Sequence, residues 1–269
     1  MAKLKSLGIV SENTTLSPRD PQAKPWEEIS AEQRKEIAHR MEIYAAQIDS
    51  IDQNLGRLIA KLKELSQFKN TMILFLSDNG SSSEGGPGGF NNGKEKAPIG
   101  AALTHASAGL EWANTSNTPF RKHKISTFEG GTRTPFIVHW PAGIAAKNQL
   151  RRQSGHVIDI MPTILAATGA TCPEEHKGTV VKPPEGMNLI PVFREDSVTP
   201  RDFFWEHQGN KAARRGDWKA VRSDKMQWQL YDLSQDPTET KDLSEQQPER
   251  LATLKALWHT WSERCNVLR

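Results

Sequence analysis

The fold of this chain is decided by the stretch Met72-Ile73-Leu74-Phe75-Leu76-Ser77-Asp78-Asn79-Gly80. Its unbroken apolar run predicts a strand that is buried on both faces, as in the parallel sheets of α/β proteins. Polar side chains begin at the carboxyl end of this strand, which is where open α/β sheets bind their ligands. Asp78 and Asn79 offer a carboxylate and an amide oxygen, which are donors that Ca2+ and Mg2+ prefer. Asp-Asn-Gly is also a common turn after a strand, so a metal site and a plain turn both remain open.

A second strand-like run, at residues 136–140, follows a charged and glycine-rich segment. Together they read Lys124-Ile125-Ser126-Thr127-Phe128-Glu129-Gly130-Gly131-Thr132-Arg133-Thr134-Pro135-Phe136-Ile137-Val138-His139-Trp140. Because glycine permits close backbone contact, we expect Gly130 and Gly131 to shape the backbone ahead of the strand. Arg133 is expected to pair with Glu129 or another buried carboxylate. We therefore predict structural roles for the Glu-Gly-Gly segment and for Arg133.

The order of these motifs resembles that of the sulfatase family, and most closely its arylsulfatase-like members. The shared pattern is a strand that ends in Asp-Asn-Gly, then Lys-x-x-x-x-Glu-Gly-Gly-x-Arg-x-Pro, then a second strand with Trp-Pro. The likeness continues in consistent order through His156, Asp159–Thr163, Phe204–His207, Gly216–Lys219, Leu230–Leu233 and Asp236–Glu239. The resemblance therefore covers nearly the whole chain.

The resemblance implies an α/β fold: part of an alkaline-phosphatase-like doubly wound sheet domain, followed by a small α+β domain with an antiparallel sheet and a helix. We place the first domain at residues 1–198, as the carboxyl-terminal portion of the sulfatase catalytic domain, and the second at residues 199–269. The implied activity is that of a sulfuric ester hydrolase, in which a bound metal assists the hydrolysis of a small-molecule or carbohydrate sulfate ester.

The resemblance also implies roles for single residues. Lys124 would be both a catalytic and a substrate-binding residue, because its ammonium would neutralise the charge that builds up as the S–O bond of a sulfate ester breaks. Asp78 and Asn79 would bind the metal, Ca2+ or alternatively Mg2+, and His207 would contact the organic part of the substrate. The ordinary alternatives stay open: Lys124 as a solvated loop lysine, and His207 as a histidine at a strand end.

One departure from the family concerns the nucleophile. Sulfatases carry a Cys-x-Pro/Ser-x-Arg motif, whose Cys or Ser becomes formylglycine. Neither Cys172 nor Cys265 is followed by this pattern. The chain therefore looks like the carboxyl-terminal half of a sulfatase, with formylglycine expected only in the missing upstream half, and the chain alone is predicted to be inactive. The alternatives are a phosphomonoesterase or phosphonate-ester hydrolase of the alkaline-phosphatase superfamily, and a truncated, non-catalytic remnant.

The composition excludes several classes of protein. A formal net charge of +3 over 269 residues, evenly spread, is too weak for a nucleic-acid-binding protein. No segment is long and apolar enough to span a membrane, and residues 1–8 lack the apolar core of a signal peptide. The location and the oligomeric state of the chain are left open, although a periplasmic or secreted location is expected for a full-length relative. A hydrophobic fraction of 36% is modest, so the chain made alone is expected to expose apolar surface.

A long helix is predicted from residue 30 to residue 65, with Ser30 and Gln33 as a capping box at its start. Its apolar positions alternate spacings of four and three: Ile37, Met41, Tyr44, Ile48, Ile51, Leu55, Leu58, Leu62 and Leu65. That seven-residue repeat keeps a coiled-coil dimer open as an interpretation. Ile43 and Ile59 widen the stripe, and a strand follows directly, so packing of the helix on a sheet is favoured.

The rest of the chain is divided by glycine-rich and turn-forming segments. About forty residues between Asn79 and Pro119 form a loop that is either a functional lid or a solvated insertion. After residue 200, short strands alternate with turns, which predicts an antiparallel meander followed by a final helix. Basic residues on these strands, among them Lys211 and Lys219, favour an anionic polymer as a ligand or protect an edge strand against association.

Overall fold

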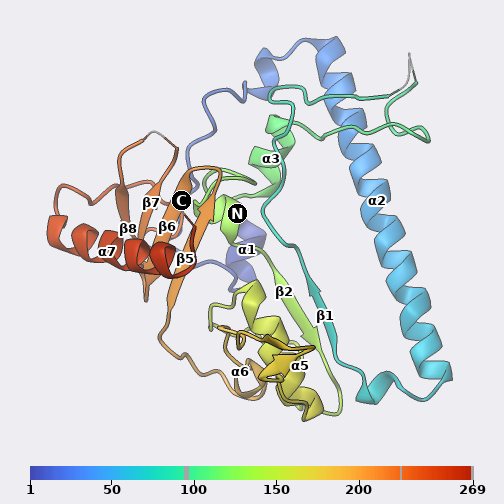
Figure 1. The fold of residues 1–269 in the computed structure, drawn as a ribbon. Helices are drawn as coiled ribbons and strands as arrows, with labels where there is room; N and C mark the ends of the chain where they lie inside the picture. Colours follow the sequence, from blue (N-terminus) through green and yellow to red (C-terminus); the bar gives the residue numbers. More distant parts are fainter. Residues whose placement is uncertain (94–96, 225, 268–269) are drawn as a thin grey trace. The chain divides into compact units, whose positions relative to one another are not determined.

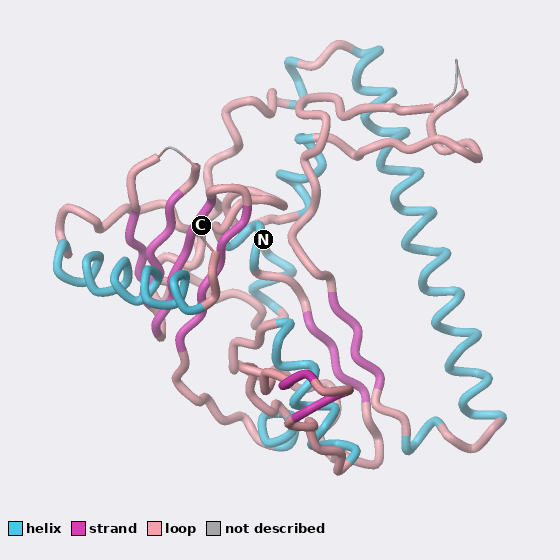
Figure 2. Tube along the Cα trace, viewed as in Figure 1, coloured by secondary structure: helices cyan, strands magenta, loops and turns pink. Residues whose placement is uncertain are grey.

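The computed structural model describes residues 1–93, 97–224 and 226–267. The chain forms two compact units that interleave along the sequence. Unit 1 consists of Met1–Ile59, Asn79–Pro135 and Asp202–Arg269, and unit 2 consists of Ala60–Asp78 and Phe136–Arg201. Figures 1 and 2 show the helices and strands of both units. The predicted domains, 1–198 and 199–269, are two continuous segments, whereas each of these units combines separate segments of the chain. The predicted domains stay a prediction.

The carboxyl-terminal part of unit 1 is a four-stranded antiparallel meander in the order β5-β6-β7-β8. Its strands are β5 Asp202–His207, β6 Asn210–Arg215, β7 Trp218–Arg222 and β8 Gln229–Asp232. Helix α7, Pro248–Arg264, crosses one face of this sheet (Figure 1). The predicted meander and final helix are confirmed. The edge-strand interpretation of Lys211 and Lys219 is wrong, because β6 and β7 are the two central strands.

Alternation of side chains along the central strands gives each face of this sheet its own apolar cluster. The face under α7 holds Ala213, Ala220, Leu230, Leu254 and Trp258. The opposite face holds Phe128, Ala212, Val221, Tyr231 and Leu233. Because Phe128 precedes the Glu-Gly-Gly motif, this second cluster connects the sheet to the predicted sulfate-binding segment.

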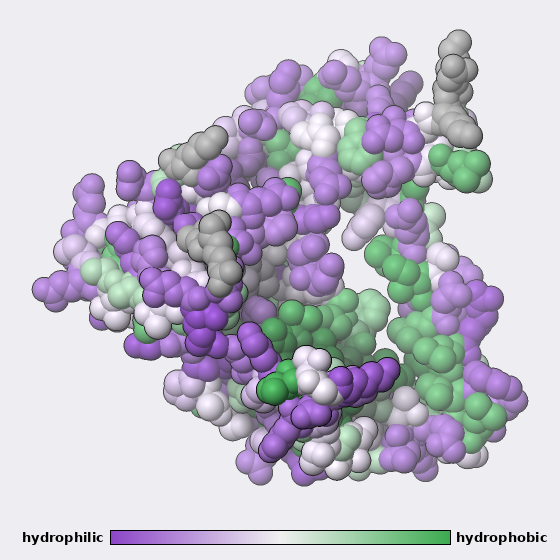
Figure 3. Space-filling view, viewed as in Figure 1, coloured by the Kyte–Doolittle hydropathy of each residue, from purple (hydrophilic) through white to green (hydrophobic). Residues whose placement is uncertain are grey.

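Helix α2, Ala31–Glu64, confirms the predicted long helix. Ser30 Oγ accepts a hydrogen bond from the Gln33 N–H at 3.2 Å, which caps the first turn. Most of the apolar stripe is exposed, for example 48% at Ile48 and 54% at Leu58, and Figure 3 shows hydrophobic surface along this helix. The sheet of unit 1 does not cover this stripe, and the predicted packing of the helix on the strand that follows it stays a prediction. The four-stranded sheet of the same unit uses both of its faces for other clusters.

The glycine-rich loop is fastened to the first turns of α2. Arg40, which is buried in α2, donates hydrogen bonds to Phe90 O at 2.7 Å and to Ser107 O at 2.8 Å. Trp112 donates its indole N–H to Ile37 O at 2.6 Å. These contacts pack the described part of the loop against the helix.

In unit 2, strands β1 (Ile73–Leu76) and β2 (Phe136–His139) form an antiparallel pair. The predicted strand with two buried faces is wrong, since Phe75 is 45% and Ile137 is 58% exposed. An apolar cluster of Leu189, Ile190, Val192 and Phe193 packs against Met72, Val138 and Trp140. At the other end of the strand pair, the neighbours Phe75 and Leu76 and the neighbours Phe136 and Ile137 are all exposed, so exposure there does not alternate between the two faces.

Helix α5, Ile160–Thr168, ends at Gly169, which adopts the left-handed conformation (φ 71°) that favours glycine at a helix end. The Asp159 carboxylate before this helix is fully buried. It accepts hydrogen bonds from His156 N–H (2.7 Å), Met187 N–H (2.9 Å) and Arg201 Nη1 (2.6 Å). This network gives the Asp159–Thr163 motif a structural role within unit 2.

The remaining elements are short: α1 Ala2–Ser6, η1 Trp26–Glu28, η2 Phe68–Asn70, α3 Leu110–Ser116, α4 Glu129–Thr132, η3 Val157–Asp159, β3 Glu175–His176, β4 Thr179–Val180 and α6 Ile190–Arg194. Within the described ranges, no helix combines the length and the apolar character needed to cross a membrane. Cys172 and Cys265 are free thiols. Residues 94–96 of the predicted loop lie outside the described residues, and the choice between a lid and an insertion stays open.

Candidate functional site

The two motifs of the predicted site touch through their glycines. The Gly80 N–H donates to Gly131 O at 3.0 Å. A Cβ added at Gly80 would collide with Gly130 O, so this position admits only glycine. Gly80, which ends the Asp-Asn-Gly turn, and the Glu-Gly-Gly segment are therefore in direct backbone contact within unit 1.

Lys124 lies in a closed loop, residues 121–131, which we term the lysine loop. The Gly130 N–H donates to Arg121 O at 2.8 Å and closes the loop. The Lys124 N–H donates to Ser81 O at 3.0 Å, one residue beyond the Asp-Asn-Gly turn. The structure thus brings the Lys124 backbone next to the chain that follows this turn.

The Lys124 ammonium forms an ion pair with Glu84, at 3.0 Å from Oε1. Both side chains are partly exposed, 37% for Lys124 and 44% for Glu84. Pairs at such exposure are screened by water and contribute little to stability. An anion such as sulfate can therefore compete with Glu84 for the ammonium at small cost.

Polar side chains surround the lysine loop. Lys122 Nζ pairs with Asp20 Oδ2 at 3.0 Å, and His123 Nδ1 shares a hydrogen bond with Ser83 Oγ at 2.8 Å. Burial lowers the pKa of His123 below its ordinary value, against the raising effect of its hydrogen bond to Lys124 O. A neutral imidazole is favoured near neutral pH, so His123 adds no fixed positive charge beside Lys124.

Asp78 and Asn79 follow β1 closely. Asp78 is exposed, and Asn79 is half-buried, with its amide nitrogen donating to Gly80 O at 3.0 Å. Their oxygens are of the hard type that Ca2+ and Mg2+ bind, but Ca2+ takes about 6–8 ligands. The described part of the chain contains no group of three or more His, Cys, Asp or Glu side chains that could hold a metal ion. Asp78 and Asn79 therefore fit the metal in kind and cover only part of its ligand shell.

His207 ends β5 at the tip of the β5–β6 hairpin, and it is exposed. The hairpin turns through Gln208 and Gly209, which both have positive φ, 50° and 84°. The structure shows His207 as a residue at a strand end, and its contact with the substrate stays a prediction.

A buried charge cluster lies on the sheet face opposite α7. Lys219 Nζ is 2.7 Å from Glu129 Oε1 and 3.0 Å from Glu239 Oε1, and all three residues are buried. Glu129 also lies 3.9 Å from Arg133, the predicted partner, but its nearer partner is Lys219. Sequence reasoning missed Lys219 and Glu239. The available signal is the alternation in β7, which puts Lys219 on the same face as the buried Val221.

The two carboxyl groups of this cluster titrate differently. Burial raises the pKa of Glu239 to about 7, because Lys219 offsets it only in part and Glu129 adds repulsion. Burial acts in the same direction on Glu129, but Lys219 and Arg133 bring its pKa below the ordinary value. The pair therefore retains one proton up to about neutral pH.

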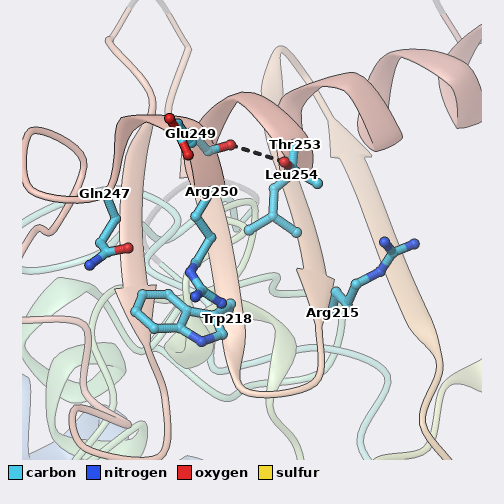
Figure 4. A pocket seen from close by; sticks show the side chains of 7 residues that line it. All are labelled: Arg215, Trp218, Gln247, Glu249, Arg250, Thr253 and Leu254. Atoms are coloured by element: carbon cyan, nitrogen blue, oxygen red, sulfur yellow. Dashed lines mark hydrogen bonds between the residues drawn. The ribbon is translucent and has the colours of Figure 1, made fainter.

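A surface pocket of about 340 Å3 lies between the β6–β7 turn and the start of α7 (Figure 4). Its lining residues are Arg215, Trp218, Gln247, Glu249, Arg250, Thr253 and Leu254. The Arg250 guanidinium stacks on the Trp218 ring, 4.0 Å from its centroid, and so covers that aromatic face. The predicted site residues do not line this pocket, and we do not count it as part of the candidate site.

Comparison with known proteins relates these motifs to a family. The Sulfatase family model matches residues 12–170, and the model for N-sulphoglucosamine sulphohydrolase, C-terminal, matches residues 121–264. An uncharacterized sulfatase of Schizosaccharomyces pombe is 31% identical over 284 residues, which cover 98% of this chain and 51% of that protein. An arylsulfatase of Klebsiella aerogenes is 33% identical over 202 residues, which cover 71% of this chain and 43% of that protein. The chain thus spans about half the length of the curated relatives it matches.

Solved structures also resemble this chain in fold, over about half of their own length. Ps i-CgsB in complex with k-i-k-neocarrahexaose has a TM-score of 0.62 at 23% identity, covering 91% of this chain and 48% of that chain. Structural likeness to sulfatases confirms the expected α/β class with an alkaline-phosphatase-like fold, although the described strands pair in antiparallel fashion. The family model covers more than half of the sequence, and the chain belongs to the sulfatase family.

Proposed function

We propose that this chain supplies the sulfate-binding lysine and part of the metal site of a sulfuric ester hydrolase of the arylsulfatase type. One observation carries the proposal: the two motifs are joined by hydrogen bonds from Gly80 N–H to Gly131 O and from Lys124 N–H to Ser81 O, both of 3.0 Å. Through them the turn that carries Asn79 and the lysine loop form one piece of unit 1. A sulfate ester bound at this turn would meet the lysine.

Lys124 would act as the cation that binds the sulfate group. Its ammonium would exchange Glu84, at 3.0 Å, for an oxygen of the ester. During hydrolysis the S–O bond to the alcohol or phenol breaks, and negative charge builds up on the oxygens around sulfur. A lysine placed there stabilises the transition state more than the ground state, which is what accelerates the reaction.

Asp78 and Asn79 would hold a divalent cation, Ca2+ or Mg2+, through a carboxylate oxygen and an amide oxygen. When bound, such a cation withdraws charge from the sulfate oxygens and orients the ester. Two side chains cover only part of the ligand shell, so we propose that further carboxylates come from the portion of longer sulfatases with which this chain does not align.

The nucleophile would come from that same portion. The resemblance to sulfatases implies formylglycine, and neither Cys172 nor Cys265 stands in the required motif. The chain alone is therefore proposed to be inactive.

The substrate proposed is a small-molecule or carbohydrate sulfate ester. The arylsulfatase among the relatives supports a sulfated phenol, and relatives named N-acetylgalactosamine-6-sulfatase support a sulfated sugar. His207 is the residue of the carboxyl-terminal sheet that we propose for contact with the organic part.

The test starts from the gene. The reading frame upstream of Met1 is read for a Cys or Ser followed by Pro or Ser two positions later and by Arg two positions after that. The longest product that contains this chain is then assayed with 4-nitrophenyl sulfate and 4-nitrophenyl phosphate in the presence of Ca2+. We expect the motif and preferential hydrolysis of the sulfate. A preference for the phosphate would favour a phosphatase, and a product with neither motif nor turnover would contradict the proposed function.

A further inference from the structure

The buried cluster of Glu129, Lys219 and Glu239 combines ion pairs with a hydrogen bond to the backbone of the lysine loop. Glu239 Oε2 accepts a hydrogen bond from the Glu129 N–H at 2.6 Å, at the start of α4. Glu239 Oε1 faces the Lys219 ammonium at 3.0 Å as an ion pair, without the direction of a hydrogen bond. Glu239 itself adopts φ 56°, a left-handed conformation that is rare for a residue with a side chain. Such a conformation persists only where surrounding contacts hold it.

The same cluster fastens the other end of the lysine loop. Arg121 Nη1 donates to Glu239 O and to Tyr231 Oη, both at 3.1 Å. Between the two ends, Thr127 Oγ1 donates to Lys211 O of β6 at 3.0 Å. The lysine loop is therefore attached to the four-stranded sheet near its start, its middle and its end.

The lysine loop has no spare room between these attachments. A Cβ added at Gly130 would collide with the carbonyl oxygens of Arg121 and Lys122. A loop folded this tightly cannot adjust locally, so a shift at its attached ends moves the whole loop. Lys124 lies between those ends and moves with them.

We propose that the Glu129–Lys219–Glu239 cluster is a clamp that positions Lys124 by holding the lysine loop on the sheet. The inference rests on the proposed function for the role of Lys124, and goes beyond it by assigning a positioning role to three residues that are buried from solvent. A clamp made of charges, unlike one made of apolar contacts, depends on the protonation of its carboxyl groups.

The charged and titratable groups around the two carboxyl groups are Arg121, Arg133, Arg214, Lys219 and Tyr231. While the loop is closed, the pKa of Glu239 is raised to about 7, so the carboxyl group keeps its proton in mildly acidic solution. Once the loop opens to water, the pKa returns to its ordinary value of 4.5 and the proton is lost above that pH. The closed form is favoured most at about pH 4.5 and loses this advantage as the pH rises towards about 7. Glu129, with its lowered pKa, titrates below that window.

The clamp is tested by hydrogen exchange on the full chain, measured by mass spectrometry of peptides from the lysine loop and from β5–β8. Lys219→Met removes the ammonium. Arg222→Met is the matched control, because Arg222 lies on the same strand and its guanidinium bonds to Met226 O instead. We expect Lys219→Met to speed exchange in the lysine loop by about tenfold or more while β5–β8 stay protected. The control should leave the loop unchanged.

A milder variant covers the case in which Lys219→Met fails to fold. Glu239→Gln keeps the size of the side chain and copies the protonated acid. In the wild type, protection of the lysine loop, corrected for the intrinsic effect of pH on exchange, should fall by up to about tenfold per pH unit between about pH 5 and 7. In Glu239→Gln the same protection should be flat over this range.

Three results would overturn the clamp: unchanged loop exchange in Lys219→Met, equal loss of protection in loop and sheet, or the same pH slope with and without Glu239. None of these readouts needs a metal, a sulfate ester or turnover. A failed clamp would therefore leave the proposed hydrolysis standing. Absent hydrolysis in the 4-nitrophenyl sulfate assay would in turn leave the exchange result valid.

Discussion

Lys124 is the residue with the most specific proposed role. In a full-length protein, Lys124→Ala should lower kcat/KM for an aryl sulfate by about 100-fold or more, because a donor that stabilises developing charge is lost. Steady-state kinetics with Ca2+ present measure the change. Lys122→Ala is the matched control: it removes an ammonium from the same loop, but one that pairs with Asp20, and should cost far less. A Lys124→Ala enzyme with the wild-type rate would remove this lysine from the site.

Asp78 is the carboxylate of this chain that we propose as a metal ligand. In a full-length protein, Asp78→Ala should abolish metal-dependent activity and lower the amount of Ca2+ retained after dialysis, because a carboxylate ligand is lost. The helix signal in circular dichroism should not change, since Asp78 is exposed. Asp52→Ala, which removes an exposed carboxylate from α2, is the control and should retain the metal. Retained metal stoichiometry in Asp78→Ala would argue against its ligand role.

At the scale of single residues, the sequence predicts positions better than contacts. The motifs that hold Asp78, Asn79 and Lys124 could be recognised from the sequence, whereas contacts such as Gly80 N–H to Gly131 O appear only in the structure. The burial of Lys219 was missed, because a strand lysine is ordinarily exposed and the alternation in β7 is a weak signal against that expectation. Its partners Glu129 and Glu239 lie on distant segments, and only the folded sheet brings them to it.

At the scale of elements, the paired glycines of the lysine loop offer a direct test. Gly130→Ala places a methyl group against two carbonyl oxygens and should loosen the loop at a cost of about 1–3 kcal/mol, as overpacking does. Hydrogen exchange in the lysine loop measures the effect. Gly56→Ala in α2 is the control, because its new Cβ meets no atom within 4 Å, and it should stabilise the helix by up to about 1 kcal/mol. Equal, small effects of both substitutions would show that the loop is not tightly packed.

Helices and strands with a regular spacing of apolar residues were predictable from the sequence. The elements that they pack against were not. Helix α2 and the meander β5–β8 follow from spacing that the sequence states directly. What α2 packs against depends on which sheet faces are free, and both faces of the sheet in unit 1 are used. The burial of β1 likewise depends on neighbouring strands that its own residues do not encode. The short strand run was therefore correct as a strand and wrong as a strand with two buried faces.

At the scale of the whole molecule, exposed apolar side chains bear on how the chain behaves when it is made alone. Large apolar side chains are exposed on α2 and on both strands of unit 2. We expect the chain expressed alone to be poorly expressed or loosely packed, with a broad thermal transition in calorimetry. A sharp, cooperative melt would show that these surfaces need no cover.

The central claim is that Asp78, Asn79 and Lys124 serve one sulfate ester. The most direct measurement is a crystal structure of the full-length protein with Ca2+ and sulfate. We predict a cation about 2.3–2.6 Å from oxygens of Asp78 and Asn79, with the sulfate between that cation and the Lys124 ammonium. A cation bound elsewhere, or a Lys124 ammonium too far away to reach the same sulfate, would contradict the claim.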